Sequence, residues 1–308
     1  MERMKLLIDT DPGVDDALAI MLAHTRADVV GLTIAAGNVG LAHTVANALK
    51  VVEMLGAKTP VFAGCANPLV LAAADAAFVH GNDGFGDTGY APSNLAAENE
   101  HAVDAILRLS HEHAGKLVIA SIAPMTNIAM ALRRDPTLPE RVAHLVVMGG
   151  AVTHRGNTHL VGAEFNVGFD PEAAHVVFST WPKFTLVDWE LTVRHGLEFE
   201  MLERWITNGR AIARFYDTIS AKTRAWTTQR GRPRLMVADA LALAVLLEPS
   251  IVRHAEDRHV AVELNGTLTR GATVVDWDQR LGGRANARIV MDIDQARFES
   301  LIGATLAG

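Results

Sequence analysis

The chain has 308 residues, of which 49% are hydrophobic and 20% are charged, and its formal net charge is −7. This size and composition suit one large α/β domain or two smaller ones, and the acidic balance argues against binding to nucleic acid. Cys65 is the only cysteine, which excludes an intramolecular disulfide framework. The first apolar run is too short for a signal peptide or a membrane span, so we expect a soluble cytoplasmic protein with no membrane partner.

The first predicted elements are a strand, a tight turn at Pro12-Gly13 and a helix. Asp11, Asp15 and Asp16 crowd this turn, where the helix dipole stabilises a carboxylate by only about 0.3–1 kcal/mol. One Asp alone would be read as an N-cap, but carboxylates this close raise one another's pKa unless a cation neutralises them. Because the turn offers only hard oxygen ligands, it predicts a Ca²⁺ or Mg²⁺ site.

Short apolar strands then alternate with helical patterns, at 29–35, 61–63, 117–120, 145–148, 184–187 and 289–291. This alternation predicts βαβ units in a single Rossmann-like α/β domain over residues 1–308, with a mainly parallel central sheet flanked by helices. Ligands of such sheets bind beyond the carboxyl ends of the strands. Asp11, Asn38 and Thr126 all follow strand ends, so we expect them to line one crevice.

Other stretches interrupt or follow this alternation. The glycine-rich segment 80–87 predicts a tight, irregular loop, and the segment 197–234 reads as one or two amphipathic helices that could form a lid over the site. The run 239–247 is apolar on all sides and predicts a buried helix, with Asp239 as a plausible N-cap. Two later runs flank Asn265-Gly266, which predicts a hairpin and hence a mixed edge of the sheet.

Six stretches of the chain, in this order, resemble the inosine-uridine preferring nucleoside hydrolases. They are Asp9–Ala17, Gly37-Asn38, 80–87, Ala123–Asn127, Glu164-Phe165-Asn166 with Asp170–Ala174, and the helix at Asp239. The first and the Glu-Phe-Asn stretches are specific, and the others add weight through their order. The resemblance spans nearly the whole chain and implies an enzyme that hydrolyses the N-glycosidic bond of ribonucleosides, giving ribose and a free base.

The same resemblance implies roles for individual residues. The side chains of Asp11, Asp16 and Asp239 and the carbonyl of Thr126 would hold a Ca²⁺. The cation would lower the pKa of a bound water, and Asp11 would accept its proton on the way to an oxocarbenium-like transition state. Four side chains would bind the ribose hydroxyls, and Phe165 would line the sugar pocket or belong to the core; the four are Asp15, Asn38, Glu164 and Asn166.

The sequence departs from the family pattern at two places. Asn157 is the candidate for the ribose 5′ end, but it lies one residue further from Glu164 than expected. Ala238 occupies the position where many members have a His that protonates the leaving base. We therefore expect His80 to donate that proton, or Trp226 to stack on the base and raise its basicity; either side chain could instead have only a structural role.

Two other functions remain open at this point. Asp9-Thr10-Asp11 also resembles the nucleophile and acid pair of a haloacid dehalogenase-type phosphohydrolase, with Ser121 as a further match, although no late acidic pair is found. Alternatively, the protein could bind ribose or a nucleoside without catalysis, since Ala238 cannot act as an acid. The family resemblance implies a homodimer or homotetramer, and the preferred base is not evident.

Overall fold

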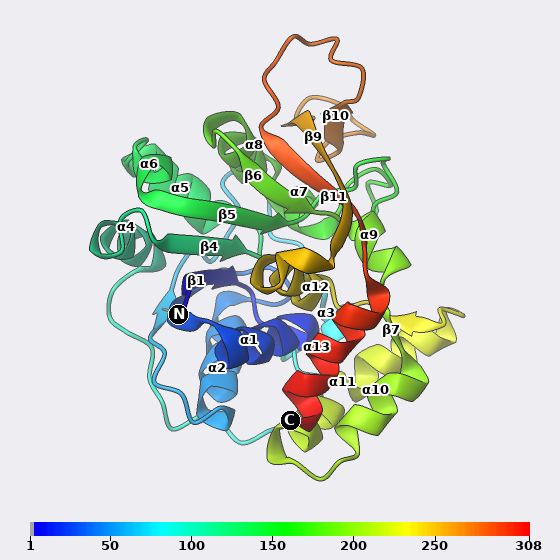
Figure 1. The fold of residues 1–308 in the computed structure, drawn as a ribbon. Helices are drawn as coiled ribbons and strands as arrows, with labels where there is room; N and C mark the ends of the chain where they lie inside the picture. Colours follow the sequence, from blue (N-terminus) through cyan, green and yellow to red (C-terminus); the bar gives the residue numbers. More distant parts are fainter. Residues whose placement is uncertain (1–2) are drawn as a thin grey trace.

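A nine-stranded sheet runs through the computed structural model, which describes residues 3–308 (Figure 1). The strand order is β10-β9-β11-β6-β5-β4-β1-β2-β3. All pairs from β3 to β11 are parallel, whereas β9 is antiparallel to both β11 and β10. The predicted α/β class, with a mainly parallel sheet and a mixed edge, is confirmed.

The strands of the large sheet, in chain order, are β1 (Lys5–Thr10), β2 (Asp28–Ile34), β3 (Val61–Ala63), β4 (Leu117–Ser121), β5 (Val142–Met148), β6 (Phe184–Val187), β9 (Val252–Val262), β10 (Thr273–Asp276) and β11 (Ala287–Ile293). A separate antiparallel pair joins β7 (Leu197–Glu198) to β8 (Arg234–Leu235). The strands predicted at 29–35, 61–63, 117–120, 145–148, 184–187 and 289–291 therefore all exist, with similar bounds, whereas β9 begins well before the run predicted for it.

The helices are α1 (Val14–Arg26), α2 (Leu41–Met54), α3 (Ala77–His80), α4 (Ala102–Glu112), α5 (Thr126–Arg134), α6 (Leu138–Arg141), α7 (Phe165–Phe169), α8 (Pro171–Thr180), α9 (Trp189–Arg194), α10 (Phe199–Ile206), α11 (Ala211–Gln229), α12 (Ala238–Leu247) and α13 (Gln295–Ala307). A 3₁₀ turn, Pro249–Ile251, follows α12. No helix within residues 3–308 combines the length and the apolar character that crossing a membrane requires.

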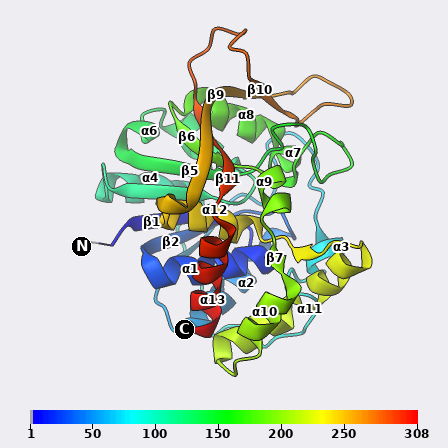
Figure 2. The same ribbon diagram turned by 45° about the vertical axis from the view of Figure 1, so that its right-hand side comes forward.

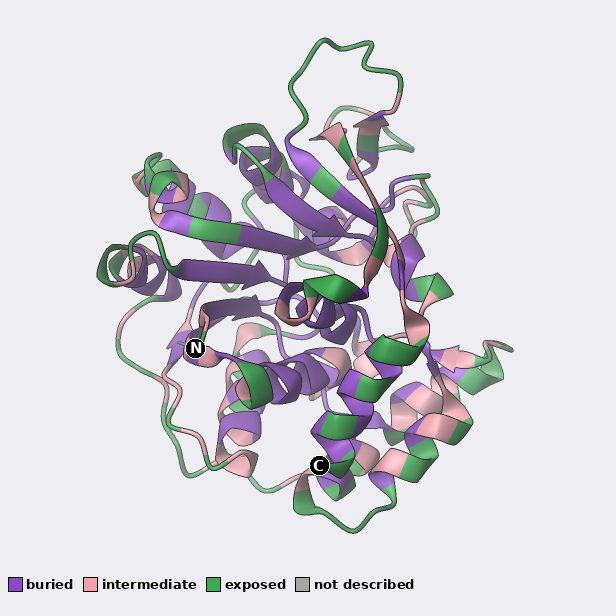
Figure 3. Ribbon diagram, in the orientation of Figure 1, coloured by how far each residue is buried: buried purple, intermediate pink, exposed green. Residues whose placement is uncertain are grey.

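Two hydrophobic cores lie on the two faces of the sheet. Successive residues of a strand point to opposite faces, so Leu6 and Ile8 of β1 pack in one core and Leu7 in the other. The first core lies under α1, α12 and α13, and the second under α4, α5 and α8 (Figures 1 and 2). Strands covered on both faces are buried throughout their centre, as Figure 3 shows, which explains their near-continuous apolar sequences.

The helix α12 has apolar residues on all sides because it packs between α1 and the sheet. Asp239 is its second residue, and the N-cap is Val237, so the N-cap role that the sequence predicts for Asp239 is wrong. The carboxylate is nevertheless buried in the first turn, at the end of the helix that faces the carboxyl ends of the strands. Because it does not cap α12, the Asp239 carboxylate can bind a ligand at this end of the sheet.

The hairpin at the sheet edge is real, but Asn265-Gly266 is not its two-residue turn. β9 ends at Val262 and β10 begins at Thr273, paired with each other, so the connection is a long loop. Within that loop, the carboxylate of Glu263 accepts hydrogen bonds from the backbone N–H of Asn265 (2.5 Å) and of Gly266 (3.0 Å). These contacts make a local turn that competes with the hairpin geometry expected for Asn-Gly.

Candidate active site

A cavity of about 330 Å³ opens at the carboxyl ends of the parallel strands. Of the predicted site residues, most line it: Asp11, Asp15, Asn38, His80, Asn157, Glu164, Phe165, Asn166, Trp226 and Asp239. Asp16 and Thr126 do not line the cavity but are buried beside it. The crevice that the strand ends predict therefore exists, and it collects side chains from all along the chain.

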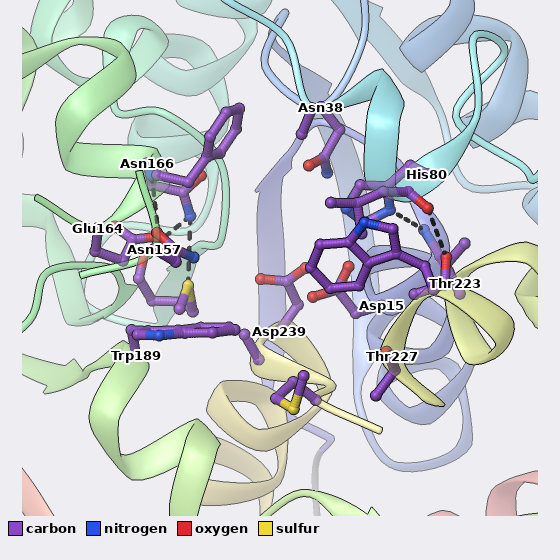
Figure 4. A pocket seen from close by; sticks show the side chains of 18 of the residues that line it. Asp15, Asn38, His80, Asn157, Glu164, Asn166, Trp189, Thr223, Thr227 and Asp239 are labelled. Atoms are coloured by element: carbon purple, nitrogen blue, oxygen red, sulfur yellow. Dashed lines mark hydrogen bonds between the residues drawn. The ribbon is translucent and has the colours of Figure 1, made fainter. Parts of the chain in front are cut away.

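The cavity has two facing walls that come from different elements (Figure 4). One wall carries polar side chains from the segment that follows β5: Asn157, Glu164 and Asn166. The facing wall carries side chains from α3 and α11: His80, Thr223 and Thr227. Asp15 and Asp239 lie between these walls, and Trp189 lies on the polar side.

The turn after β1 is tied together by Asp16. Its Oδ1 accepts from the Thr10 hydroxyl at 2.6 Å and from the Asp11 N–H at 3.3 Å. Its Oδ2 accepts from the Gly13 N–H and from the Asn38 side-chain amide, each at 3.0 Å. Asp16 thus satisfies N–H groups at the start of α1 that have no partner within the helix, while it fixes the position of its neighbours.

Asp11 keeps one oxygen without a partner. Its Oδ2 accepts from the Asn38 N–H at 2.7 Å, but its buried Oδ1 has no hydrogen-bond partner among the described residues. Burial raises the pKa of Asp11 well above its usual value, and the nearby charges of Asp16 and Asp15 raise it further. An oxygen in this state lacks a proton donor or a cation, because buried polar atoms ordinarily find a partner.

Three more carboxylates converge beside Asp11. Oxygens of Asp15, Asp16 and Asp239 all lie within 4.8 Å of one another. Burial raises the pKa of Asp239, and the charges of Asp15, Asp16 and Asp11 add to this effect. Like charges packed in a dry site are costly unless a cation neutralises them, and oxygen ligands suit a hard divalent cation. These residues therefore suit a hard divalent cation. The cluster contains the predicted ligands Asp16 and Asp239, and its third member is Asp15 rather than the predicted Asp11.

Two glycines make room for this arrangement. A Cβ on Gly37 would lie 2.1 Å from Oδ2 of Asp11, and a Cβ on Gly13 would lie 2.6 Å from Nδ1 of His80. Each distance is far below van der Waals contact, so the backbone approaches these side chains in a way that only glycine permits. The Pro-Gly and Gly-Asn pairs in the sequence are thus part of how the site is built.

Thr126 begins α5, and its hydroxyl donates to Oδ2 of Asp170 at 2.7 Å. The other oxygen of Asp170 caps α8 by accepting from the Ala173 N–H at 3.0 Å, and Oδ2 also accepts from the Leu69 N–H at 2.9 Å. One carboxylate therefore joins α5, α8 and the segment after β3. It holds Thr126 in place behind the aspartates.

Glu164 is an N-cap that also faces the cavity. It accepts from the N–H groups of Asn166 (3.0 Å), Val167 (3.2 Å) and Gly150 (2.9 Å), and burial raises its pKa to about 7. The Asn166 side chain donates to the carbonyls of Ile122 (3.1 Å) and Met148 (3.2 Å), which follow or end β4 and β5. These bonds fix the Glu-Phe-Asn stretch against the strand ends.

His80 lies at the end of α3, and its Nδ1 accepts from the Val14 N–H at 3.2 Å. The ring proton of the neutral imidazole is therefore on Nε2. Burial lowers the pKa of His80 to about 4. The glycines of the following loop include Gly81 at φ 88°, which explains the irregular path that the sequence predicts there.

Sequence analysis missed several residues of the cavity: Phe78, Trp189, Thr223, Thr227, Arg230, Arg232 and Met236. Trp189 follows directly after β6 and Asp188, so the strand-end rule could have found it. Arg230 and Arg232 belong to the basic turn at 230–234, and nothing in its sequence distinguishes a turn that lines a cavity from an exposed surface turn. The Trp226 indole stacks with Arg230, whose guanidinium carbon lies 3.9 Å from the ring centroid.

Asp9, the nucleophile in the phosphohydrolase alternative, does not line the cavity. It is fully buried, and its Oδ1 accepts from the side chains of Thr33 (2.7 Å) and Asn127 (2.9 Å). Burial raises its pKa to about 7. A buried carboxylate turned away from the cavity cannot attack a substrate there.

Comparison with known proteins agrees with this geometry. A sequence model of the family described as "Inosine-uridine preferring nucleoside hydrolase" matches residues 6–300. The chain belongs to this family. The Crithidia fasciculata inosine-uridine preferring nucleoside hydrolase is 34% identical over 304 residues, which cover 97% of this chain and 96% of that protein. The Escherichia coli pyrimidine-specific ribonucleoside hydrolase RihB is 32% identical over 311 residues, covering 100% and 98%.

The fold of this nucleoside hydrolase is also that of a solved relative. An Inosine-Guanosine Nucleoside Hydrolase superposes with a TM-score of 0.92 at 32% identity, covering 98% of each chain. The protein is therefore an enzyme that hydrolyses N-glycosyl compounds, and the phosphohydrolase and binding-protein alternatives are not favoured. The names of these relatives cover purine and pyrimidine nucleosides at similar identity, so overall similarity does not indicate the base.

Proposed function

We propose that this nucleoside hydrolase uses Ca²⁺ and water to cleave ribonucleosides into ribose and free base, with Asp11 as the general base. The observation that carries this proposal is the buried, unpartnered Oδ1 of Asp11 beside the carboxylates of Asp15, Asp16 and Asp239. A bound Ca²⁺ would neutralise these charges and, as a Lewis acid, make a water molecule in its coordination shell easier to deprotonate. Its proposed ligands are Asp11, Asp16, Asp239 and the Thr126 carbonyl, with Asp15 nearby.

Asp11 would accept the proton of the attacking water. Its Oδ2 is held by the Asn38 N–H, so the side chain has a fixed orientation, and its Oδ1 is available to accept a proton from the attacking water. Water adds to C1′ of the ribose while the bond to the base breaks, and the electrons of that bond move to the base. Positive charge that develops on the sugar ring would be stabilised by the surrounding carboxylates.

The polar wall would bind the sugar. Asp15, Asn38, Glu164 and Asn166 present oxygen and amide groups to the same cavity, and ribose offers hydroxyls that can bind them. Asn157, in the loop after β5, would contact the 5′ end, and the half-buried ring of Phe165 would lie against the sugar.

On the base side, we propose that His80 donates a hydrogen bond to the leaving base through Nε2–H, since its Nδ1 is occupied by the Val14 N–H. Burial lowers the pKa of His80 to about 4, so the ring is neutral near pH 7 and acts through this hydrogen bond rather than by giving up a proton. Trp226 would stack on the base. The segment 197–234 would act as a lid on a single domain, since the last turns of α11 and the turn after it contribute Thr223, Trp226 and Arg232 to the cavity. The cytoplasmic location and the homodimer or homotetramer stay predictions from the sequence.

Metal removal tests this proposal. The protein as purified should contain about one divalent cation per chain, and chelation should abolish release of reducing sugar from ribonucleosides until Ca²⁺ is restored. In parallel, p-nitrophenyl phosphate should yield no phosphate. Full ribonucleoside hydrolysis after complete removal of metal would overturn the metal dependence, and restoration by Mg²⁺ but not Ca²⁺ would overturn the choice of ion.

A further inference from the structure

An arginine side chain lies near two tryptophans that line the cavity. Arg232, in the turn between α11 and β8, is half-buried and lines the cavity. Its guanidinium carbon lies 5.9 Å from the ring centroid of Trp189 and 5.9 Å from that of Trp226. The side chain is thus placed between two indole rings that belong to separate elements, α9 and α11.

The donors of Arg232 are almost unused. A guanidinium carries five N–H donors, but the one hydrogen-bond partner of Arg232 among residues 3–308 is the weak acceptor Sδ of Met236, at 4.0 Å. No carboxylate pairs with it in that part of the chain, and burial together with the charge of Arg230 lowers its pKa. An arginine that is partly removed from water without an anionic partner is costly, which points to a ligand that supplies acceptors.

Thr227 is a second unused polar group on the same side. It is 1% exposed, it lines the cavity, and its Oγ1 has no hydrogen-bond partner among the described residues. Thr227 lies on α11, four residues after Thr223, so both hydroxyl side chains face the cavity from one side of the helix (Figure 4). The Thr223 hydroxyl is already committed to the Val79 carbonyl at 3.1 Å.

The two sides of the cavity suit the two halves of a nucleoside. The carboxylates and amides suit a sugar with several hydroxyls, whereas flat indole faces and a guanidinium suit a planar, electron-rich ring. Ala238, where a proton donor would be expected, offers no polar atom to that ring. Besides the Nε2–H proposed for His80, the departing base therefore needs a second group to stabilise its charge.

We propose that Arg232 binds the acceptor edge of the departing base, and that the site therefore selects 6-oxopurine ribonucleosides. This inference rests on the proposed ribonucleoside hydrolysis at the same site. A 6-oxopurine presents O6 and N7, two adjacent acceptors that match the forked donors of a guanidinium. Adenine presents a donor amino group beside N7 and would face the same guanidinium with a donor against a donor.

The same contact would assist the chemistry. As the C1′–N9 bond breaks, its electron pair moves onto the purine, and the charge spreads to N7 and O6. Two N–H groups from Arg232 would strengthen their hydrogen bonds as that charge grows, which lowers the barrier without transfer of a proton. The water that adds to C1′ gives one proton to Asp11, which later returns it to solvent, and the departing purine anion takes one proton from solvent, so the products are neutral ribose and neutral base.

Kinetics with matched substrates test the inference. We expect inosine and guanosine to exceed adenosine in kcat/KM by about 10- to 100-fold, the usual discrimination of a bidentate arginine contact. Arg232→Gln should lower kcat/KM for inosine and guanosine by a similar factor, barely change it for adenosine, and so collapse the preference. Arg232→Lys keeps the charge but not the fork, so it should restore turnover of inosine in part without restoring the discrimination.

Two controls separate recognition of the base from damage to the fold. Arg214→Gln removes the same charge from an exposed position of α11 outside the cavity, so it should leave every kcat/KM within about twofold. The substrate p-nitrophenyl riboside lacks the purine edge, so Arg232→Gln should hydrolyse it as the unmodified enzyme does.

Several kinetic results would overturn the proposed role of Arg232. Equal losses on inosine, adenosine and p-nitrophenyl riboside would overturn the inference, as would adenosine being the best purine substrate of the unmodified enzyme. A larger loss on inosine 5′-monophosphate than on inosine would also overturn it, because Arg232 would then bind phosphate. If no ribonucleoside is hydrolysed at all, the proposed function itself fails, which is a distinct result.

Discussion

Replacement of Gly37 by Ala is a direct test of where Asp11 acts. A Cβ at this position would lie 2.1 Å from Oδ2 and 2.8 Å from Cγ of Asp11, and 2.9 Å from Cδ of Pro124. Ordinary contact needs roughly 3.5 Å, so the carboxylate or the loop must move by more than about 1 Å. Movement of Asp11 would also break its 2.7 Å hydrogen bond with the Asn38 N–H.

The expected effect on turnover is large, whereas that on stability is moderate. A misplacement of about 1 Å in a catalytic group can lower the rate about 10²-fold, and overpacking typically costs about 1–3 kcal/mol of unfolding free energy. We therefore expect Gly37→Ala to lower kcat for inosine or uridine about 10²-fold or more, while the protein remains folded at 25 °C. The assay is release of reducing sugar, with a thermal unfolding curve and metal content measured on the same sample.

Gly40→Ala is the matched control. Gly40 lies three residues further on, at the N-cap of α2, with φ −61° and ψ 151°, and a Cβ there would meet nothing within 4 Å. Both variants make the same change in the unfolded chain, and Gly40→Ala affects only the N-cap of α2, so a difference in turnover reports the contact of the new Cβ at position 37 with Asp11 and Pro124. If Gly37→Ala turned over substrate within threefold of Gly40→Ala, Asp11 would not be held where the reasoning requires.

Three further predictions concern the proposed chemistry. Asp11→Asn should lower kcat at least about 10²-fold, and metal content measured on the variant separates loss of the base from loss of the cation; near-normal turnover would remove Asp11 from the mechanism. 2′-Deoxyuridine should lose several orders of magnitude in kcat/KM relative to uridine, because Asp15 and Asn166 would be left facing no hydroxyl; equal cleavage would argue against that sugar site. His80→Ala should slow natural nucleosides about 10²-fold or more, because the departing base loses a hydrogen-bond donor, but barely change p-nitrophenyl riboside, whose leaving group is stable as an anion; equal slowing of both would make His80 a structural residue.

The sheet was predictable because its signals are local. Each parallel strand is buried on both faces, so a short apolar run indicates it directly, and the residues after the run fall at one edge. This reasoning predicts from the sequence that Asp11 and Asn38 share a cavity, and both residues line it. It did not give the hairpin turn, because the Glu263 side chain organises its own loop through contacts that no turn rule includes.

The approach of Arg232 to Trp189 and Trp226 was harder to predict because it depends on packing between distant segments. Arg232 lies near Trp189 only because β8 pairs with β7, which places the basic turn beside the start of α9. The hydrophobic periodicity of the sequence does not predict that these two side chains lie close together. Asp239 is a second example of a role that depends on distant segments. Its place near a helix start predicts an N-cap, but its proximity to Asp15 and Asp16 makes it part of a carboxylate cluster.

The order in which the chain is made bears on how this enzyme folds. α1 is buried against α12 and also packs with α13, although more than two hundred residues separate it from both. At a synthesis rate of about 5–20 residues per second, the apolar surface of α1 waits roughly 10–45 s for α12 to emerge from the ribosome. β11 must also enter between β6 and β9 after both have been made. The acidic cluster is complete only when Asp239 arrives, so the nascent chain passes through a long stage in which it is open to aggregation and lacks its full set of carboxylates.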